Sequence, residues 1–452
     1  MGNHNQNMPA RMGRRHFMGQ AGLLGSAMLL SPLGASAQEV SRCTGEDAAT
    51  TQDLSVGMCL NESVEFLDEA TARPSRQLTS RRKINYQPTY HIRQCFSADS
   101  RHLPIGSYDD QGSCVFWANV VTGDMTVLSV MRGASDERYT GNLTATIAGG
   151  RMVAAATRKT LRILDTSLLE KERVLLDETD SNRLFGAPAG SLDGKTVFIP
   201  VNEEVQQVGR PADPGHRVTA NMANSALLAV DVASGRPTEV FSDPLFANNS
   251  VTPNPVYPDL LLLDRDDPGV FVRLMKEAQF ARYDEAQKIW ESSPLSSRTC
   301  VLDLKSGKLT EIHPRNAFGF AVHSTWSADG QFIYHHGWAA EGGHWIGVTT
   351  AAGEVVFERV YPKFFYGHIA SHQTMNVIVV DGLISPDLVI GLHFEDLDAT
   401  GSPRLEILAR HNSDWSVPQA SHPHCHVSPD GRWLSYNRGK DGHTDVCVTR
   451  IA

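Results

Sequence analysis

Three histidines alternate near the C-terminal end of the sequence, in the stretch Gln419-Ala-Ser-His422-Pro-His424-Cys-His426. A Ser-Pro-Asp-Gly turn signal and the alternating run Arg432–Tyr436 follow, which predicts a strand, a tight turn and a second strand. Side chains two residues apart on a strand share one face, about 7 Å from each other. Imidazoles in such a row, helped by the amide oxygen of Gln419, can hold a divalent metal ion. The alternative is a polar strand whose histidines bond to neighbours and water.

The elements that must position these residues repeat along the chain. Turns between strands occur at Phe96–Arg101, Gly190–Lys195, Trp326–Gln331 and Val427–Arg432. Segments that read as strand, small turn and strand occur at Val115–Gly123, Leu227–Gly235, Val301–Gly307 and Ile346–Gly353. Each pairing of the two halves makes a four-stranded antiparallel unit, and the units recur every ~40–70 residues, as propeller blades do once insertions are allowed.

The repeat predicts an all-β fold, a seven-bladed β-propeller with a helical insertion. The last unit, His422–Ile451, looks one strand short, and a strand near Arg82–Tyr90 could complete it and close the ring. Apolar spacing at i, i+4 and i+8 predicts an amphipathic helix in the insertion, from Val270 through Ala278 to Trp290, packed over one face of the ring. A two-sheet sandwich is the alternative, and it fits so long a series of strand repeats poorly.

Residues 1–37 have the pattern of a twin-arginine export signal. The pair Arg14-Arg15 precedes an apolar run, Ala21–Leu30, and the small-residue site Ala35-Ser-Ala37 follows. An uncleaved N-terminal helix is the alternative, but the run is too short to span a membrane. We therefore expect a soluble protein exported to the periplasm or beyond by the Tat pathway, with no membrane partner in its mature form. Residues 38–80 read as a polar arm or linker, and 81–452 as the propeller domain.

Charge and cysteine content narrow the class of protein further. Without residues 1–37, which hold three arginines and no acids, 38 basic residues face 51 acidic ones, so binding of nucleic acid through bulk charge is not expected. All seven cysteines lie beyond the signal, and an odd number leaves at least one unpaired. Cys43 and Cys59 flank a polar segment and could pair. No Cys-x-x-Cys metal pair is present.

The turn aspartates give a register for the central channel. His424, His323 and Arg93 each lie six residues before the aspartate of their turn, so their side chains should reach one cavity from three units. A slip of one residue would turn any of them outward. His368 and His372 open the inner strand of another unit, and both are candidate ligands.

For one arginine and three further histidines, the sequence gives weaker evidence of a functional role. Arg298 opens the strand before Val301, and a lone arginine is usually a solvated or salt-bridged group. His335, His336 and His344 are expected to be structural or exposed.

These residues together resemble a known family, the oligogalacturonate lyases of polysaccharide lyase family 22. The resemblance runs thinly from about residue 84 to the end and rests on Asn412–His424, Ser371-His372, Ser297-Arg298-Thr299, His323–Gly330 and Ile92–Phe96. The Gln-x-x-His-Pro-His element is its specific part, since Ser-x-Asp-Gly turns occur in many propellers.

The resemblance implies a seven-bladed propeller that binds a divalent metal, typically manganese. It implies that the metal ligands are His372, Gln419, His422 and His424, that His323 is the Brønsted base, and that Arg298 is the partner of the substrate carboxylate. The register adds Arg93 as a substrate-binding residue. Two departures concern the substrate: Asn254 stands where the family carries a histidine, and the insertion 270–293 is unlike the family.

The implied chemistry suits these residue types. A uronic acid carries a proton next to its carboxylate, at C5, and removing it builds further negative charge on that group. A metal ion and an arginine neutralise this charge, and a neutral histidine takes the proton. The linked sugar at C4 then leaves, which yields a 4,5-unsaturated uronate.

Other classes fit the sequence less well. The competing class is a periplasmic propeller that binds partners without catalysis. The sequence contains no Gly-x-Ser-x-Gly motif of a serine hydrolase and no His-Glu-x-x-His motif of a metallopeptidase.

Overall fold

The computed structural model describes residues 43, 50–133, 139, 144–204, 222–243, 247–266, 283–284, 289–290, 297–313, 321–338, 343–365, 367–372, 374–415, 417 and 421–452. The predicted export signal lies outside this range. Within it, none of the helices has the length and hydropathy needed to span a bilayer.

The repeated unit is a four-stranded antiparallel sheet, except that one unit has five strands. In one unit, β23 (Val322–Trp326), β24 (Phe332–Trp338), β25 (His344–Thr350) and β26 (Val355–Tyr361) pair in chain order. The Ser-x-Asp-Gly sequence makes its first turn. Ser327 Oγ donates to Asp329 Oδ1 over 2.6 Å, the backbone N–H of Gln331 donates to the same oxygen over 3.0 Å, and Gly330 has a φ of 68° that favours glycine.

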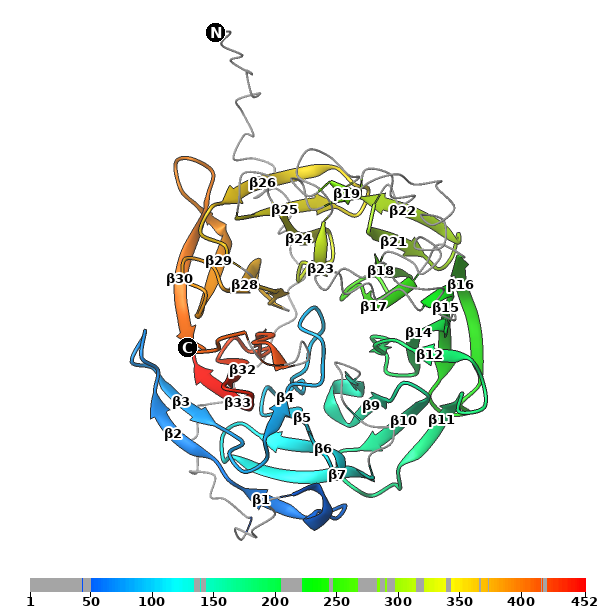
Figure 1. Cartoon of the computed structure of the whole chain (residues 1–452). Coiled ribbons are helices and arrows are strands. Elements are labelled where there is room, and N and C mark those ends of the chain that lie inside the picture. The colour runs from blue at the N-terminus through cyan, green and yellow to red at the C-terminus, as the bar shows by residue number, and fades with distance from the viewer. Residues whose placement is uncertain are drawn as a thin grey trace, which may run out of the picture.

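Seven such units follow one another along the described residues, and the other six have these bounds: β4 (Ile84–Tyr86), β5 (His102–Asp109), β6 (Gly112–Asn119) and β7 (Asp124–Arg132); β8 (Thr144–Ile147), β9 (Met152–Ala156), β10 (Thr160–Asp165) and β11 (Arg173–Asp177); β12 (Arg183–Phe185), β13 (Ala189–Gly190), β14 (Thr196–Glu204), β15 (Met222–Asp231) and β16 (Pro237–Asp243); β17 (Ala247–Pro253), β18 (Leu260–Asp266), β21 (Thr299–Asp303) and β22 (Lys308–Ile312); β27 (Ile369–Ser371), β28 (Val377–Asp381), β29 (Leu388–Leu397) and β30 (Pro403–Arg410); β31 (His426–Val427), β32 (Trp433–Lys440), β33 (His443–Arg450) and β3 (Pro74–Gln77). Short 3-10 helices, η1 (Thr51–Asp53) and η2 (Ala148–Gly150), lie among them. The units are arranged as a ring around a central axis, so the predicted propeller is confirmed (Figure 1).

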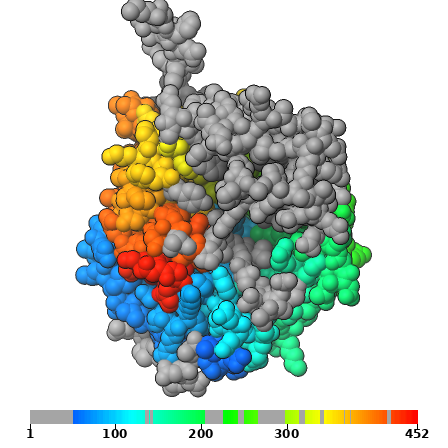
Figure 2. Space-filling view, in the orientation of Figure 1, coloured from blue at the N-terminus to red at the C-terminus, as the bar shows by residue number. Residues whose placement is uncertain are grey.

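Strands from the two ends of the chain close the ring. β3 pairs antiparallel with β33, and β2 (Val64–Leu67) pairs with β3 on its outer side. β1 (Cys59–Asn61) extends the first unit beside β7. Figure 2 shows the blue N-terminal residues directly beside the red C-terminal ones.

Two expectations about this region need correction. The strand that completes the last unit is β3, whereas β4, in the segment 82–90, pairs mainly with β5 and touches β33 at one parallel bridge. Residues within the predicted arm 38–80 are therefore part of the propeller sheets, because the open edge of β33 needs a hydrogen-bonding partner.

Buried apolar side chains fill the space between neighbouring units. One cluster joins Tyr334 and Ile346 of one unit to Ile378, Val380 and Ile390 of the next. Packing of this kind fixes the position of each inner strand around the axis, and the candidate functional residues lie on these strands or in the segments next to them.

The helix predicted from Val270 to Trp290 lies mostly outside the described residues. The described part of it forms two short antiparallel strands, β19 (Tyr283–Asp284) and β20 (Ile289–Trp290), so the prediction is wrong for these positions. The aromatic and β-branched residues Tyr283, Ile289 and Trp290 favour strands over the helical pattern.

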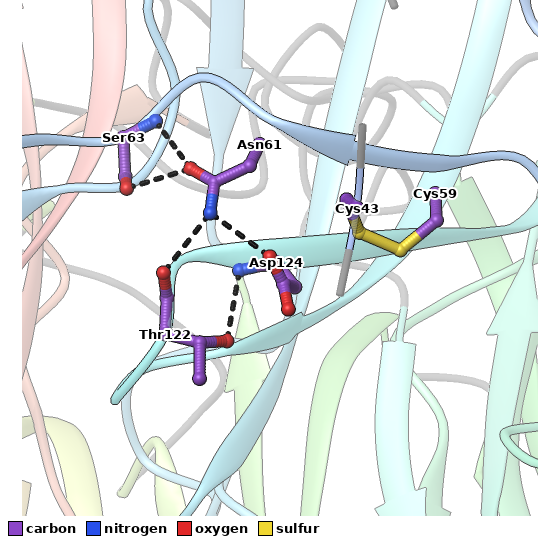
Figure 3. The surroundings of a disulfide bond; sticks show 6 residues. All are labelled: Cys43, Cys59, Asn61, Ser63, Thr122 and Asp124. Atoms are coloured by element: carbon purple, nitrogen blue, oxygen red, sulfur yellow. Dashed lines mark hydrogen bonds between the residues drawn. A yellow bond between two sulfur atoms is a disulfide. The ribbon is translucent and has the colours of Figure 1, made fainter. Parts of the chain in front are cut away.

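The pairing of Cys43 with Cys59 is present and ties the chain before η1 to strand β1 (Figure 3). Beside it, Asn61 Nδ2 donates to Asp124 Oδ1 over 2.9 Å and to the carbonyl oxygen of Thr122 over 3.0 Å. The remaining five cysteines are buried as free thiols in the described part of the chain.

Candidate metal centre and active site

Three buried histidines meet on the axis of the ring. His91 lies between β4 and β5, His368 precedes β27, and His424 precedes β31. One ring nitrogen from each lies within 4.8 Å of the others. The three residues come from distant parts of the sequence, and only the ring brings them together.

Hydrogen bonds prepare these nitrogens as ligands. His91 Nδ1 lies 2.6 Å from the carbonyl oxygen of Ile369, and because a carbonyl only accepts, Nδ1 carries the proton. His91 Nε2 therefore bears a lone pair, and it is buried with no hydrogen-bond partner among the described residues. His368 Nδ1 lies 3.2 Å from Asp381 Oδ2, which leaves its Nε2 as the acceptor nitrogen. A metal-binding histidine commonly has such a partner on its second nitrogen.

The distance between two of these nitrogens fits a shared ion. His424 Nε2 and His368 Nε2 lie 3.2 Å apart. Two nitrogens at about 2.1 Å from one ion lie roughly 3.0–3.4 Å apart for angles between octahedral and tetrahedral. His91 adds a ring nitrogen within 4.8 Å of the other two and a buried lone pair, so the three residues could together hold a divalent metal.

Asp381 organises two of the three histidines at once. Its Oδ2 accepts the backbone N–H of His424 over 3.0 Å as well as facing His368 Nδ1, and its Oδ1 accepts the backbone N–H of His368. The carboxylate is fully buried at the end of β28. It therefore holds two ligands that belong to different units in position, and it fixes the tautomer of His368.

Of the four ligands predicted from the sequence, the structure places His424 in this group. His422 is adjacent, with its ring centre 5.8 Å from that of His368 and 6.2 Å from that of His424. Gln419 lies outside the described residues. His372 is not a member of the group: its Nδ1 accepts the backbone N–H of Thr374 over 3.0 Å.

His323 lies against the three histidines. Its ring centre is 4.8 Å from that of His91 and 4.9 Å from that of His368. The pairing of β23 with β24 shifts register between Val322 and Thr325, and His323 has a φ of 52° in this bulge. A bulge turns a side chain away from the regular alternation of its strand, and here it turns His323 toward the axis.

Burial holds the pKa of His323 well below its ordinary value, and the neighbouring His368 and Arg298 lower it further, against a hydrogen bond to the Gly367 backbone. The pKa values of His91 and His424 are lowered in the same way, first by burial and then by nearby histidines. All three rings are therefore neutral near pH 7 and can bind a metal or accept a proton.

Arg298 is half-buried immediately before β21, and its Nε donates to the carbonyl oxygen of Arg265 over 3.0 Å. Its positive charge is near enough to contribute to the lowered pKa of His323. The sequence pattern alone indicated an ordinary surface arginine.

A cavity of about 290 Å³ opens next to the metal-ligand group. Its lining includes His91, Arg93, His372 and His426, and none of the described residues that line it is acidic. Arg93 is buried, and burial lowers its pKa to about 10, so it remains charged at neutral pH. A cavity with this lining suits an anionic ligand, although the chain as a whole is acidic.

Two functional candidates were missed in the sequence. His91 lies in an irregular segment, where no strand alternation or turn register indicates its direction. Asp381 ends an apolar run and reads as an ordinary turn residue. For His368, the sequence left two candidates four residues apart, and strand alternation alone could not separate them.

No model of a protein family matches the sequence, and no curated protein matches it. Among solved structures, the chain is similar to an oligogalacturonate lyase in complex with manganese, at 14% identity and a TM-score of 0.68, over 88% of this chain and 99% of that one. An oligogalacturonate lyase from Vibrio parahaemolyticus matches over the same shares, at 15% identity and a TM-score of 0.66. Hydrazine synthase from Kuenenia stuttgartiensis has 13% identity and a TM-score of 0.53, over 82% of this chain and 99% of that one. At such identities these comparisons show the fold.

Proposed function

We propose that the chain is a metal-dependent lyase that cleaves uronic-acid-containing oligosaccharides by β-elimination and releases a 4,5-unsaturated uronate. The observation that carries the proposal is the convergence of His91, His368 and His424 beside a neutral, buried His323. The two lyases of the same fold, one of them a manganese complex, support an oligosaccharide substrate and Mn²⁺ as the ion.

In this proposal His91, His368 and His424 hold the ion, with His422 and Gln419 as further candidates. The ligand role that the sequence suggested for His372 passes to His368, since His368 Nε2 faces His424 Nε2. A bound divalent cation would supply Lewis-acid neutralisation of the substrate carboxylate.

Side chains of the protein take the proton and bind the substrate carboxylates. His323 accepts the C5 proton, because a neutral imidazole is a competent base near pH 7. Arg298, whose charge acts on His323, binds the carboxylate and stabilises the charge that develops on it. Arg93 binds a second carboxylate of the oligosaccharide in the adjacent cavity, whose described lining has no competing acid.

The pattern Arg14-Arg15 before an apolar run and a small-residue site supports export by the Tat pathway to the periplasm or beyond. A disulfide between Cys43 and Cys59 is compatible with that compartment.

The proposal is tested with purified protein, Mn²⁺ and a panel of galacturonate, glucuronate and mixed uronide oligosaccharides, by following the absorbance of unsaturated products. We expect a metal-dependent increase that is abolished by chelator and restored by Mn²⁺. His323→Gln should lower kcat by about 10²–10⁴-fold, whereas His443→Gln, on a half-exposed ring in β33, should not. Metal binding without product from any oligosaccharide would instead support a binding protein.

A further inference from the structure

A chain of hydrogen-bonded histidines continues from His323 away from the metal-ligand group. His323 Nδ1 lies 2.8 Å from His336 Nε2, and His336 Nδ1 lies 3.1 Å from His344 Nδ1. His336 is on β24 and His344 is on the neighbouring strand β25, and both are buried. The sequence suggested that both were structural or exposed, and the metal-ligand group uses neither.

The hydrogen bonds make the tautomers of the three rings depend on one another. A neutral imidazole carries one N–H and one lone pair, and a hydrogen bond between two ring nitrogens needs one of each. Both nitrogens of His336 are engaged, so His336 must donate at one end and accept at the other. The tautomer of His323 is thereby tied to that of His336, and that of His336 to His344.

Two arrangements satisfy the contacts among these three rings. In the first, His323 and His336 carry their protons on Nδ1, His344 carries its proton on Nε2, and His323 Nε2 keeps a lone pair. In the second, every hydrogen bond is reversed, and His323 carries its proton on Nε2. Only the first arrangement leaves His323 able to accept a proton at Nε2.

The packing around the chain restricts rotation of its rings. The Phe364 ring centre lies 4.4 Å from that of His344 and 5.2 Å from that of His336, and the His336 and His344 rings stack at 5.2 Å. Rings held in this way keep their nitrogens aligned, which a solvated pair of histidines would not do.

We propose that His336 and His344 are positioning residues for His323, and that they hold it in a single tautomer; the base role proposed for His323 requires the tautomer with the proton on Nδ1 and a lone pair on Nε2. This inference rests on the proposed function in one respect, the role of His323 as the base. The arrangement of protons itself is a property of the free protein and can be measured without substrate.

The first experiment measures tautomers by ¹⁵N NMR of histidine-labelled full-length protein at neutral pH, with signals assigned through single His→Gln variants. We expect N–H on Nδ1 of His323 and His336 and on Nε2 of His344. In His336→Phe, His323 should become a mixture of tautomers. The reverse pattern, or a His323 signal unchanged by His336→Phe, would overturn the proposal.

The second experiment uses the lyase assay. His336→Phe should lower kcat roughly 10–100-fold with little change in KM, and His336→Gln should retain more of kcat, since an amide both donates and accepts. The matched control is His335→Phe, because His335 is also buried on β24 but contacts His313 and Trp345 instead. Equal losses in the His335 and His336 variants would indicate a merely structural role. If no oligosaccharide reacts with the wild-type protein, the proposed function fails, and the NMR result still decides this inference.

Discussion

Two histidines on the axis of the ring have a left-handed backbone, with φ of 52° at His323 and 42° at His424. This conformation costs a non-glycine residue of order 1–3 kcal/mol and persists where surrounding contacts enforce it. At His424 the enforcing contact is the hydrogen bond from its backbone N–H to Asp381. The strain therefore coincides with the residues that the proposed chemistry requires.

The ligand set gives a prediction at the scale of single residues. His91→Gln and His368→Gln should each weaken Mn²⁺ binding by more than the roughly 10–100-fold that loss of an outer-shell partner costs, because each removes a ligand nitrogen. His372→Gln should leave the affinity within a few-fold, since His372 is outside the group. Isothermal titration calorimetry with Mn²⁺ at pH 7.5 measures all three. Strong loss in the His372 variant alone would restore the ligand set suggested by the sequence.

A second prediction concerns Asp381, which orients ligands without belonging to the described ligand group. Asp381→Asn removes the charge that faces His368 Nδ1, so Mn²⁺ affinity should fall about 10–100-fold. Asp445→Asn is the control, since Asp445 is a buried carboxylate bonded to Thr79 and Gln77 instead. Equal affinities in the two variants would show that Asp381 does not act on the metal site.

At the scale of elements, the N-terminal strands are held by a buried ion pair. Glu62, which follows β1, pairs with Arg82, and its Oε2 accepts the backbone N–H groups of Ser80 and Arg81 over 2.7 and 2.8 Å. The Arg82 guanidinium also lies 4.9 Å from the ring centre of Phe116. The segment that closes the ring is therefore anchored on both sides of β3.

Breaking this pair should destabilise the protein. Glu62→Gln leaves the Arg82 charge buried without its carboxylate, so we expect the free energy of unfolding to fall by about 3–5 kcal/mol. Glu65→Gln provides the control: Glu65 pairs with Arg76 on the surface, where such a pair contributes about 0–1 kcal/mol. Urea unfolding of both variants measures the difference. Similar midpoints would mean that the N-terminal strands contribute little to the closed ring.

At the scale of the whole molecule, buried histidines make stability depend on pH. Burial lowers the pKa of His411 to about 4, and its Nδ1 accepts the backbone N–H of Ser413. An unfolded histidine has a pKa near 6.5, so the unfolded state binds the proton first as pH falls. The stabilising contribution is thus present above about pH 6.5 and is lost as pH falls toward 4.

This reasoning predicts that the free energy of unfolding falls by about 1.4 kcal/mol per pH unit for each such histidine between about pH 6.5 and 4. His411→Asn should reduce that slope, because asparagine does not titrate. Urea unfolding at several pH values gives the slopes, and identical slopes for the wild type and His411→Asn would contradict the assignment.

The sequence by itself determined the repeated unit, because a Ser-x-Asp-Gly turn is formed by contacts within a few residues, as Ser327 and Asp329 show. Counting back from the turn aspartate placed His424 and His323 at similar depths on different strands. The sequence also supported the pairing of Cys43 with Cys59, which lie close along the chain.

Only the tertiary structure decided which histidines can share an ion and which strand closes the ring. His91, His368 and His424 meet through packing between units far apart in sequence, and the bulge at His323 and the left-handed backbone at His424 redirect side chains that strand alternation cannot place. The closing strand is β3 and not the expected segment 82–90. The folded ring brings β3 beside the open edge of β33, where the two strands pair. Local turn chemistry is encoded over a few residues, whereas the meeting of imidazoles at the axis depends on the geometry of the whole ring.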